Sequence, residues 1–273
     1  MTLVVIGPIT NDLVVIGYER LYKTGGATYF QSFVFEEFYN DYLALVNCSS
    51  EDLVSSFPNA DKVKVILKDD THYFINEYPF EDNLNVRTQL SNFADIPIYK
   101  SDLEKLLPED IDAFVINPLN RNDFPQDTID YLKSFDVPIF ISVQGFLRVP
   151  NDKANENYTI KLDNFDKLDS ILDGVSSIFM DEVEASIIGE GFDVDEMVIT
   201  DGSNGSRIIS DREIKIDAVK CDNLCDTTGC GDTFMAAYIS QKLLSKSPQI
   251  AGDFASLIAS RKIESFGPYN YEK

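Results

Sequence analysis

Short runs of apolar, mostly β-branched residues recur along the chain and predict strands at 3–7, 42–47, 113–118, 138–143 and 196–202. Amphipathic stretches lie between several of these runs. Their apolar residues are spaced three and four apart, which predicts helices at 101–107, 127–135 and 181–189. Alternating strands and helices favour an α/β fold, a three-layer, doubly wound and mainly parallel sheet with helices on both faces.

Two segments interrupt this alternation. Residues 13–23 (LVVIGYERLYK) predict one hairpin, and residues 63–80 predict another that turns at Lys68-Asp69-Asp70. Together they predict a small β-hairpin lid over the carboxyl edge of the sheet, built from about 13–24 and 63–90. No repeat or long linker divides the sequence, so we expect a single domain over 1–273.

Composition narrows the classes of partner. The 273 residues include 46 acids and 23 bases, a formal net charge of −23. Such a charge repels nucleic acid and anionic membranes, so we expect neither as a partner. A ligand that carries phosphate therefore needs a local positive pocket or Mg²⁺. The first residues predict a strand rather than a signal peptide, and no apolar run has membrane-spanning length, which favours a cytoplasmic protein.

Cysteine and histidine are sparse. The four cysteines lack the paired spacing of zinc or redox sites, which favours reduced, structural thiols. His72 is the only histidine. A histidine-rich metal site or a Ser-His-Asp triad is therefore disfavoured, and we expect His72 on the surface of the second hairpin.

Residues 226–232 read DTTGCGD and directly precede a helical run at 233–246. Two glycines at a helix start allow unusual φ values and close approach of a ligand to the backbone. The first amides of a helix have no intrahelical partners and lie at the positive end of its dipole, so this stretch can bind an anion such as phosphate. The alternative is an ordinary turn capped by Asp or Thr.

Four motifs together resemble the ribokinase-like, phosphofructokinase-B type carbohydrate kinases. DTTGCGD resembles the D-T-x-G-A-G-D signature, with Cys230 in place of alanine. Gly25-Gly26 resembles the amino-terminal di-glycine, and Asp12 the early substrate-binding acid. Residues 200–205 (TDGSNG) are similar to the nucleotide-side T-x-G-x-x-G. The order and spacing of these motifs span nearly the whole chain.

The resemblance implies a role for each motif in phosphoryl transfer from ATP. Asp232 is implied as the general base, beside an amide nest that contains Gly229, Cys230 and Gly231. The other implied contacts are Thr200, Gly202, Gly205 and Thr228 to the ATP phosphates and ribose, and Asp12, Gly25, Gly26, Gln144 and Arg148 to the substrate. Asp232 can also simply cap its helix, and Arg148 can be an ordinary surface ion-pair partner.

Metal binding is implied at the start of another helix. Residues 181–184 (DEVE) resemble the family's N-x-x-E motif, so Asp181 and Glu184 are implied Mg²⁺ ligands. The alternative is a solvated acidic helix start. The resemblance leaves open whether a monovalent cation also assists.

The substrate interpretation depends on residues 25–30 (GGATYF) and 142–148 (SVQGFLR), which resemble the branch that contains myo-inositol kinases. Phe30 stands where sugar-binding relatives often have Asn, and this argues against a ribokinase-like contact with ribose. The predicted acceptor is a small sugar or cyclic polyol, and the protein a monomer or homodimer.

Two other functions stay open, and a third is disfavoured. A nucleoside kinase of the same family would stack a base on an aromatic residue such as Tyr29, Phe30 or Tyr78. A non-catalytic polyol or nucleotide sensor is the second alternative. An oxidoreductase is disfavoured, because the sequence has neither a G-x-G-x-x-G after the first strand nor a Walker-type loop.

Overall fold

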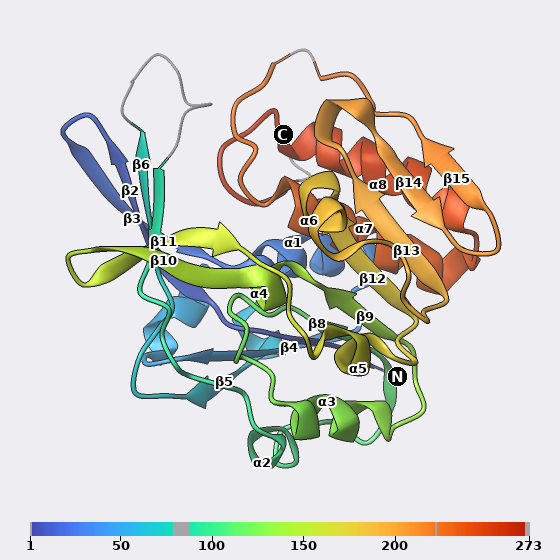
Figure 1. Ribbon diagram of the computed structural model, residues 1–273, viewed down its shortest axis with the longest axis horizontal. Helices are drawn as coiled ribbons and strands as arrows, with labels where there is room; N and C mark the ends of the chain where they lie inside the picture. The colour runs from blue at the N-terminus through green and yellow to red at the C-terminus, as the bar shows by residue number, and fades with distance from the viewer. Residues whose placement is uncertain (1, 79–87, 222, 271–273) are drawn as a thin grey trace.

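The computed structural model describes residues 2–78, 88–221 and 223–270, and within them two sheets form the framework (Figure 1). The large sheet has the order β15-β14-β13-β12-β9-β8-β1-β4-β5. Its strands from β13 to β5 are parallel, and β14 and β15 add an antiparallel edge. The predicted α/β class is confirmed.

The strands of the large sheet are β1 (Thr2–Ile6), β4 (Tyr42–Cys48), β5 (Val63–Leu67), β8 (Ile111–Ile116), β9 (Ile139–Ser142), β12 (Ser177–Asp181), β13 (Glu196–Thr200), β14 (Ser206–Ile209) and β15 (Glu213–Ile216). The helices are α1 (Ala27–Phe38), α2 (Lys100–Leu103), α3 (Gln126–Lys133), α4 (Gln144–Leu147), α5 (Leu168–Leu172), α6 (Glu182–Ile188), α7 (Cys230–Ser245) and α8 (Pro248–Lys262). Short 3₁₀ turns are η1 (Glu51–Ser56), η2 (Ala60–Lys62) and η3 (Gly202–Asn204).

The apolar character of the strands follows from their burial on both faces. Leu3 and Val5 face one core with α1, α7 and α8, whereas Val4 and Ile6 face a second core on the side of α3, α5 and α6. Successive side chains of a strand point to opposite faces, so a strand covered on both sides needs a continuous apolar run. This explains why the pattern of runs and amphipathic stretches predicted the layers correctly.

The smaller sheet is the lid. Its order is β10-β11-β7-β6-β2-β3. The strands are β2 (Thr10–Ile16), β3 (Glu19–Gly25), β6 (Phe74–Tyr78), β7 (Thr88–Ser91), β10 (Arg148–Ala154) and β11 (Asn157–Leu162). At the left of Figure 1 it projects from the edge of the large sheet.

The first predicted hairpin is present, because β2 and β3 pair antiparallel. The second prediction was wrong: β5 does not turn back onto β6 but pairs in parallel with β4 in the large sheet. Only β6 continues into the lid, beside β2. The hairpin β10–β11, which the sequence pattern did not reveal, completes the lid. Residues 79–87 of the predicted lid range lie outside the described residues.

His72 was expected on the surface, and this was wrong, because its side chain is 1% exposed. It lies between β5 and β6, where its Nε2 is 3.1 Å from Oδ1 of buried Asp123. Its Nδ1 is 3.1 Å from the side-chain amide of Asn120. Its backbone carbonyl accepts a hydrogen bond from Asn11 in the lid. His72 thus connects the loop after β8 to the start of the lid.

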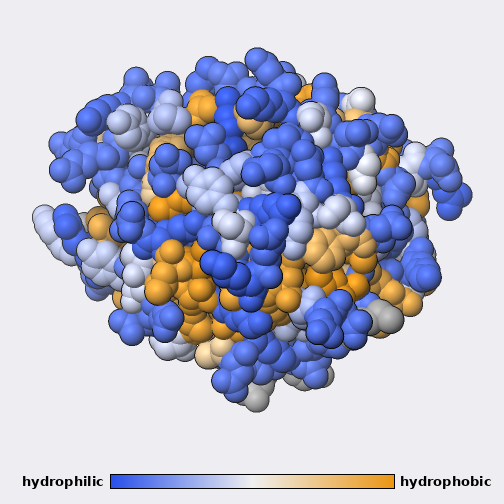
Figure 2. All heavy atoms as spheres, turned by 90° about the horizontal axis from the view of Figure 1, so that it is seen from below, coloured by the Kyte–Doolittle hydropathy of each residue, from blue (hydrophilic) through white to orange (hydrophobic). Residues whose placement is uncertain are grey.

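The surface agrees with the charge of the chain. Hydrophilic residues cover most of the face seen from below, with apolar residues visible between them (Figure 2). The four cysteines form no disulfide. Within the described ranges, no helix combines the length and apolar character needed to cross a membrane.

The buried His72 network predicts a large contribution to stability. Replacing His72 with Leu should lower the free energy of unfolding by roughly 2–4 kcal/mol, because Asp123 and Asn120 lose a buried partner. Urea unfolding with an unchanged m-value is the measurement. A change below about 0.5 kcal/mol, the range of ordinary surface substitutions, would contradict this role.

Candidate active site

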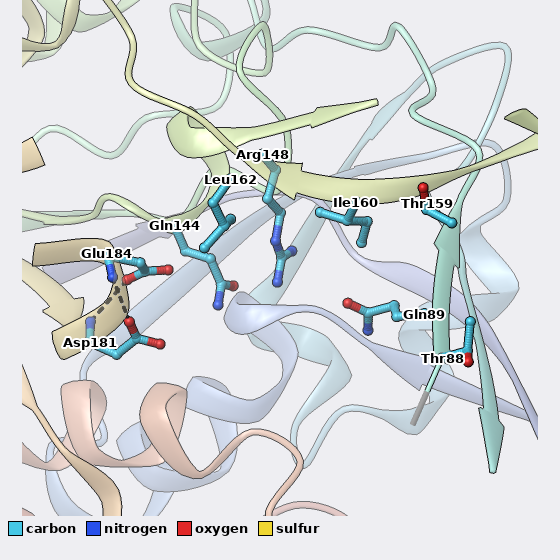
Figure 3. Close-up of a pocket in the computed structure, with 9 residues that line it drawn as sticks. All are labelled: Thr88, Gln89, Gln144, Arg148, Thr159, Ile160, Leu162, Asp181 and Glu184. Atoms are coloured by element: carbon cyan, nitrogen blue, oxygen red, sulfur yellow. Dashed lines mark hydrogen bonds between the residues drawn. The ribbon is translucent and has the colours of Figure 1, made fainter. Parts of the chain in front are cut away.

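A polar cavity of about 470 Å³ lies between the lid and the carboxyl ends of the central strands (Figure 3). Gln144 and Arg148 reach it from the two ends of α4, and Asp181 and Glu184 from the start of α6. The lid supplies the rest of the lining: Thr88, Gln89, Thr159, Ile160 and Leu162. In Figure 3 the guanidinium of Arg148 extends into the space between Gln144 and Gln89. Open α/β sheets bind ligands at this edge.

Asp181 and Glu184 form a reciprocal capping box. Asp181 Oδ1 accepts from the Glu184 amide at 2.8 Å, and Glu184 Oε2 accepts from the Asp181 amide at 2.9 Å. Glu184 is 4% exposed. Burial, followed by the charge of Asp181, raises the pKa of Glu184 to about 7, although Arg148 lowers it in part. The alternative of a solvated helix start fits Asp181, which is exposed, but not Glu184.

The DTTGCGD stretch leads into α7 through a tight turn at Gly229. This residue is the N-cap with φ 74°, in the left-handed region. A Cβ atom there would lie 2.4 Å from the ring of Phe30 on α1. Glycine is therefore required twice, for its backbone conformation and for the close packing of the helix start against α1. No side chain caps this helix. The Cys230 amide donates to the Thr227 carbonyl at 3.1 Å, whereas the described contacts leave the amides of Gly229, Gly231 and Asp232 available.

Asp232 lies in the first turn of α7 and is partly buried. Burial raises its pKa to about 6, while the positive charges of Arg148 and Lys262 lower it. The negative charge of Asp232 in turn contributes to raising the pKa of Glu184. The cavity and the α7 start are therefore close enough to share electrostatic interactions. Burial raises the pKa of the neighbouring Cys230 thiol, which disfavours a reactive thiolate.

Asp12 and the di-glycine meet at the base of the lid. Asp12 lies on β2 and its Oδ1 accepts from the Phe74 amide at 2.9 Å. Its Oδ2 would be 2.6 Å from a Cβ atom at Gly25, so the carboxylate lies against bare backbone. Gly26, with φ 94°, is the N-cap of α1. The ring of Phe74 in turn lies 5.1 Å from the Arg148 guanidinium, which connects this group to the cavity.

Only some of the residues predicted to bind the nucleotide lie together at the carboxyl edge of the large sheet. Thr200 ends β13 directly beside Asp181 of β12. Gly202 and Gly205 follow in the η3 turn between β13 and β14, both with positive φ. None of the three lines the cavity between lid and sheet. Thr228 belongs to the α7 turn, where its amide donates to Asp226 Oδ1 at 2.9 Å.

The residues at α6 fit Mg²⁺. Each carboxylate uses one oxygen in the capping box, which leaves a second oxygen on each, and burial of Glu184 disfavours its charged form without a nearby cation. Magnesium keeps several waters and typically needs one or two carboxylates beside substrate phosphates. No group of three or more His, Cys, Asp or Glu side chains is arranged for a metal among the described residues.

Sequence reasoning missed two features of this region. Gln89 and Thr159 come from lid strands whose pairing was not predicted, so no signal placed them near Gln144. Lys262, at the end of α8, contacts Asp226 of the DTTGCGD stretch. A buried lysine has no distinctive sequence pattern, and α8 had not been predicted as a helix. In addition, Tyr29 and Phe30 are 8% and 7% exposed, which disfavours base stacking by either.

This geometry predicts opposite effects for the two glycines of the α7 start. Gly229→Ala should lower the free energy of unfolding by roughly 1–3 kcal/mol, because of the positive φ and the contact with Phe30. Gly231→Ala is the matched control, since a Cβ atom there meets no other atom within 4 Å. It should leave stability unchanged or raise it by up to about 1 kcal/mol through helix propensity. Equal thermal stability of both variants would contradict the assigned packing.

The comparisons with known proteins agree with this arrangement. The model of the pfkB family carbohydrate kinases matches residues 180–273, which contain α6, the residues 200–205 turn, α7 and α8. No curated protein matches this sequence.

Solved structures match over almost the whole length. A pyrophosphate-dependent kinase in the ribokinase family, complexed with a pyrophosphate analog and myo-inositol, has a TM-score of 0.80 and 23% identity and covers 99% of this chain and 98% of its own. Arabidopsis thaliana ribokinase complexed with ribose and ATP has a TM-score of 0.71 and 18% identity, with 97% and 93% covered. A Methanocaldococcus jannaschii nucleoside kinase has 0.68 and 16%, with 97% and 92% covered.

The solved structures confirm the expected ribokinase-like fold, and the family model, which covers the motifs at residues 200–205 and 226–232, agrees with the expectation of a carbohydrate kinase. The chain has the fold of the ribokinase family, and its residues 180–273 match the pfkB family carbohydrate kinases.

Proposed function

We propose that this protein transfers the terminal phosphoryl group of ATP to a hydroxyl of a cyclic polyol, with a compound like myo-inositol as the favoured acceptor. The single observation that carries this proposal is the arrangement of Asp232. It follows the uncapped, glycine-flanked start of α7, and it shares electrostatic interactions with the residues of a polar cavity. A donor phosphate at the start of α7 and an acceptor hydroxyl in the cavity can therefore both approach the Asp232 carboxylate.

Asp232 acts as the general base. The acceptor hydroxyl gives its proton to the Asp232 carboxylate while its oxygen bonds to the terminal phosphorus, and the bond from phosphorus to the leaving phosphate breaks. The backbone amides of Gly229 and Gly231 stabilise the negative charge of the transferred group, whereas the Cys230 amide is held by the Thr227 carbonyl. A carboxylate with a pKa near 6 is a better base than an unperturbed aspartate and is still ionised at pH 7.

The other residues bind and orient. Asp12 accepts hydrogen bonds from acceptor hydroxyls, Gly25 and Gly26 allow the ring to lie against the backbone, and Gln144 and Arg148 complete the polar side of the cavity. Thr200, Gly202, Gly205 and Thr228 bind the donor. Asp181 and Glu184 would hold Mg²⁺ through their second carboxylate oxygens or through water, and the chemistry supplied there would be neutralisation of charge on the donor phosphates. The lid excludes water and so limits hydrolysis of the donor.

Pyrophosphate is a second candidate donor. It is favoured by one observation: a structure with a TM-score of 0.80 that covers 99% of this chain is described as a pyrophosphate-dependent kinase. An anion at the start of α7 and Mg²⁺ near Glu184 suit either donor, since both present linked phosphates.

A two-way panel tests acceptor and donor together. Each of myo-inositol, ribose, fructose 6-phosphate and several nucleosides is incubated with ATP or pyrophosphate and Mg²⁺, and the phosphorylated product is measured directly. We expect product with myo-inositol or a related polyol. Product only with nucleosides would replace the acceptor assignment. Ligand binding without product from any pair would favour the sensor interpretation.

The role of Asp232 predicts a selective loss of kcat. Asp232→Asn should lower kcat by roughly 10²-fold or more, with KM changed much less, because the amide cannot accept the proton. The matched control is Asp127→Asn, an exposed aspartate in the first turn of α3, which should keep normal turnover. Near-normal kcat in folded Asp232→Asn protein would rule out the base.

The pKa of Asp232 predicts an acid limb in the pH profile. Because the pKa is raised to about 6, the base is protonated below that pH, and kcat/KM should fall about tenfold per pH unit there. Activity is present above the pKa and lost as pH decreases through it. The limb should persist in Glu184→Gln, although Glu184 titrates near pH 7. An acid limb that disappears in Glu184→Gln would assign it to Glu184 instead.

A further inference from the structure

The ammonium group of Lys262 is fully buried beneath the turn that precedes α7. Its side chain is 0% exposed. The Nζ atom donates to the backbone carbonyl of Asp226 at 2.7 Å and lies 3.7 Å from Oδ2 of the same residue. Taking a cation out of water costs several kcal/mol unless it is paired and hydrogen-bonded. A lysine in this position therefore needs a specific function or a strong structural role.

Both oxygens of the Asp226 carboxylate also accept hydrogen bonds from backbone amides. Its Oδ1 accepts from the Thr228 amide at 2.9 Å, and its Oδ2 accepts from the Gly267 amide at 3.2 Å. The Asp226 amide itself donates to the Ile263 carbonyl at the end of α8. Lys262 therefore joins the end of α8, through Asp226, to a turn that reaches Gly229 three residues later.

The charge of Lys262 also reaches the proposed catalytic groups. Its charge acts to lower the pKa of Asp226, of the Cys230 thiol and of Asp232, although burial keeps the pKa of the last two above their usual values. A field that acts on all three residues extends over the start of α7, where a transferred phosphoryl group would carry negative charge. A fixed charge in a water-poor site acts more strongly than the same charge in solvent.

These contacts bear on whether a monovalent cation assists this protein. Such an ion would need carbonyl and carboxylate oxygens, and beside the α7 turn those of Asp226 are already engaged by an ammonium of the same charge. The residues present do not fit a separate ion at this place. We propose that Lys262 is a built-in monovalent cation of the phosphoryl-binding turn, so the protein needs no potassium, sodium or ammonium ion for turnover.

This proposal rests on the proposed function only for its activity readout, since cation dependence of stability tests it independently. Wild-type protein is compared in potassium, ammonium, sodium and tetramethylammonium chloride at a constant ionic strength of about 0.1 M, where general screening is equal. Both its melting temperature and its kcat should be the same in all four salts. A saturable rise of either with one small cation would overturn the proposal.

The variants Lys262→Ala and Lys262→Met then remove the ammonium. Lys262→Met keeps the length of the side chain, and its kcat should fall roughly 10²-fold, as for loss of one charge-stabilising donor. Lys262→Ala leaves space, so potassium, ammonium or methylammonium should raise its melting temperature and restore part of its kcat in a saturable way. Arg261→Ala, an exposed neighbour on the same helix, should show none of these effects.

The outcomes separate the two proposals. Salt-independent wild-type turnover, with cation rescue of Lys262→Ala, supports the built-in cation. A folded Lys262→Met protein with wild-type kcat overturns it, and so does a folded Lys262→Ala protein whose stability and kcat respond equally to all salts. If the Ala variant does not fold, the wild-type salt series and Lys262→Met still decide. If wild-type protein has no turnover with any donor and acceptor, the proposed function fails, while the melting temperatures still test Lys262.

Discussion

Burial of negative charge at the carboxyl edge of the large sheet is the constraint on which the site depends. Asp232 and Glu184 are carboxylates whose pKa values are raised by burial, in a chain that already carries a net charge of −23. Arg148 and Lys262 oppose this effect and lower the pKa of Asp232. The site is therefore a balance between desolvated acids and two nearby cations, the half-buried Arg148 and the buried Lys262, in which small changes of charge have large effects.

This balance depends on how the lid is built. Arg148 is the C-cap of α4 and the first residue of β10. It therefore connects a helix beside the large sheet to a strand of the lid. The Phe74 ring lies against its guanidinium, and the Phe74 amide binds Asp12. Movement of the lid would therefore change the environment of Arg148 and, through it, of Asp232 and Glu184. In the proposed function, this arrangement would couple acceptor binding to the strength of Asp232 as a base.

A second set of contacts, with α1 and α8, fixes the position of the start of α7. Gly229 packs against Phe30 of α1, and Lys262 of α8 binds Asp226. Two helices that are distant from each other in sequence, α1 and α8, thus determine the position of the turn that starts α7. The turn itself has the short, glycine-rich sequence typical of anion binding, but its position depends on contacts with these neighbours.

The sequence alone determined the alternation of apolar strands and amphipathic helices, and with it the α/β class, because a strand buried on both faces needs a continuous apolar run. It also predicted a glycine-flanked helix start at residues 226–232, of a kind that can bind an anion, since glycines and a helix start act through local backbone conformation. Pairing between distant segments leaves no such local pattern. Only the tertiary structure decided that β5 belongs to the large sheet, that His72 is buried, and that β10 and β11 complete the lid. It alone placed the Lys262 ammonium at Asp226, because the burial of a charge depends on which residues surround it and not on its neighbours in sequence.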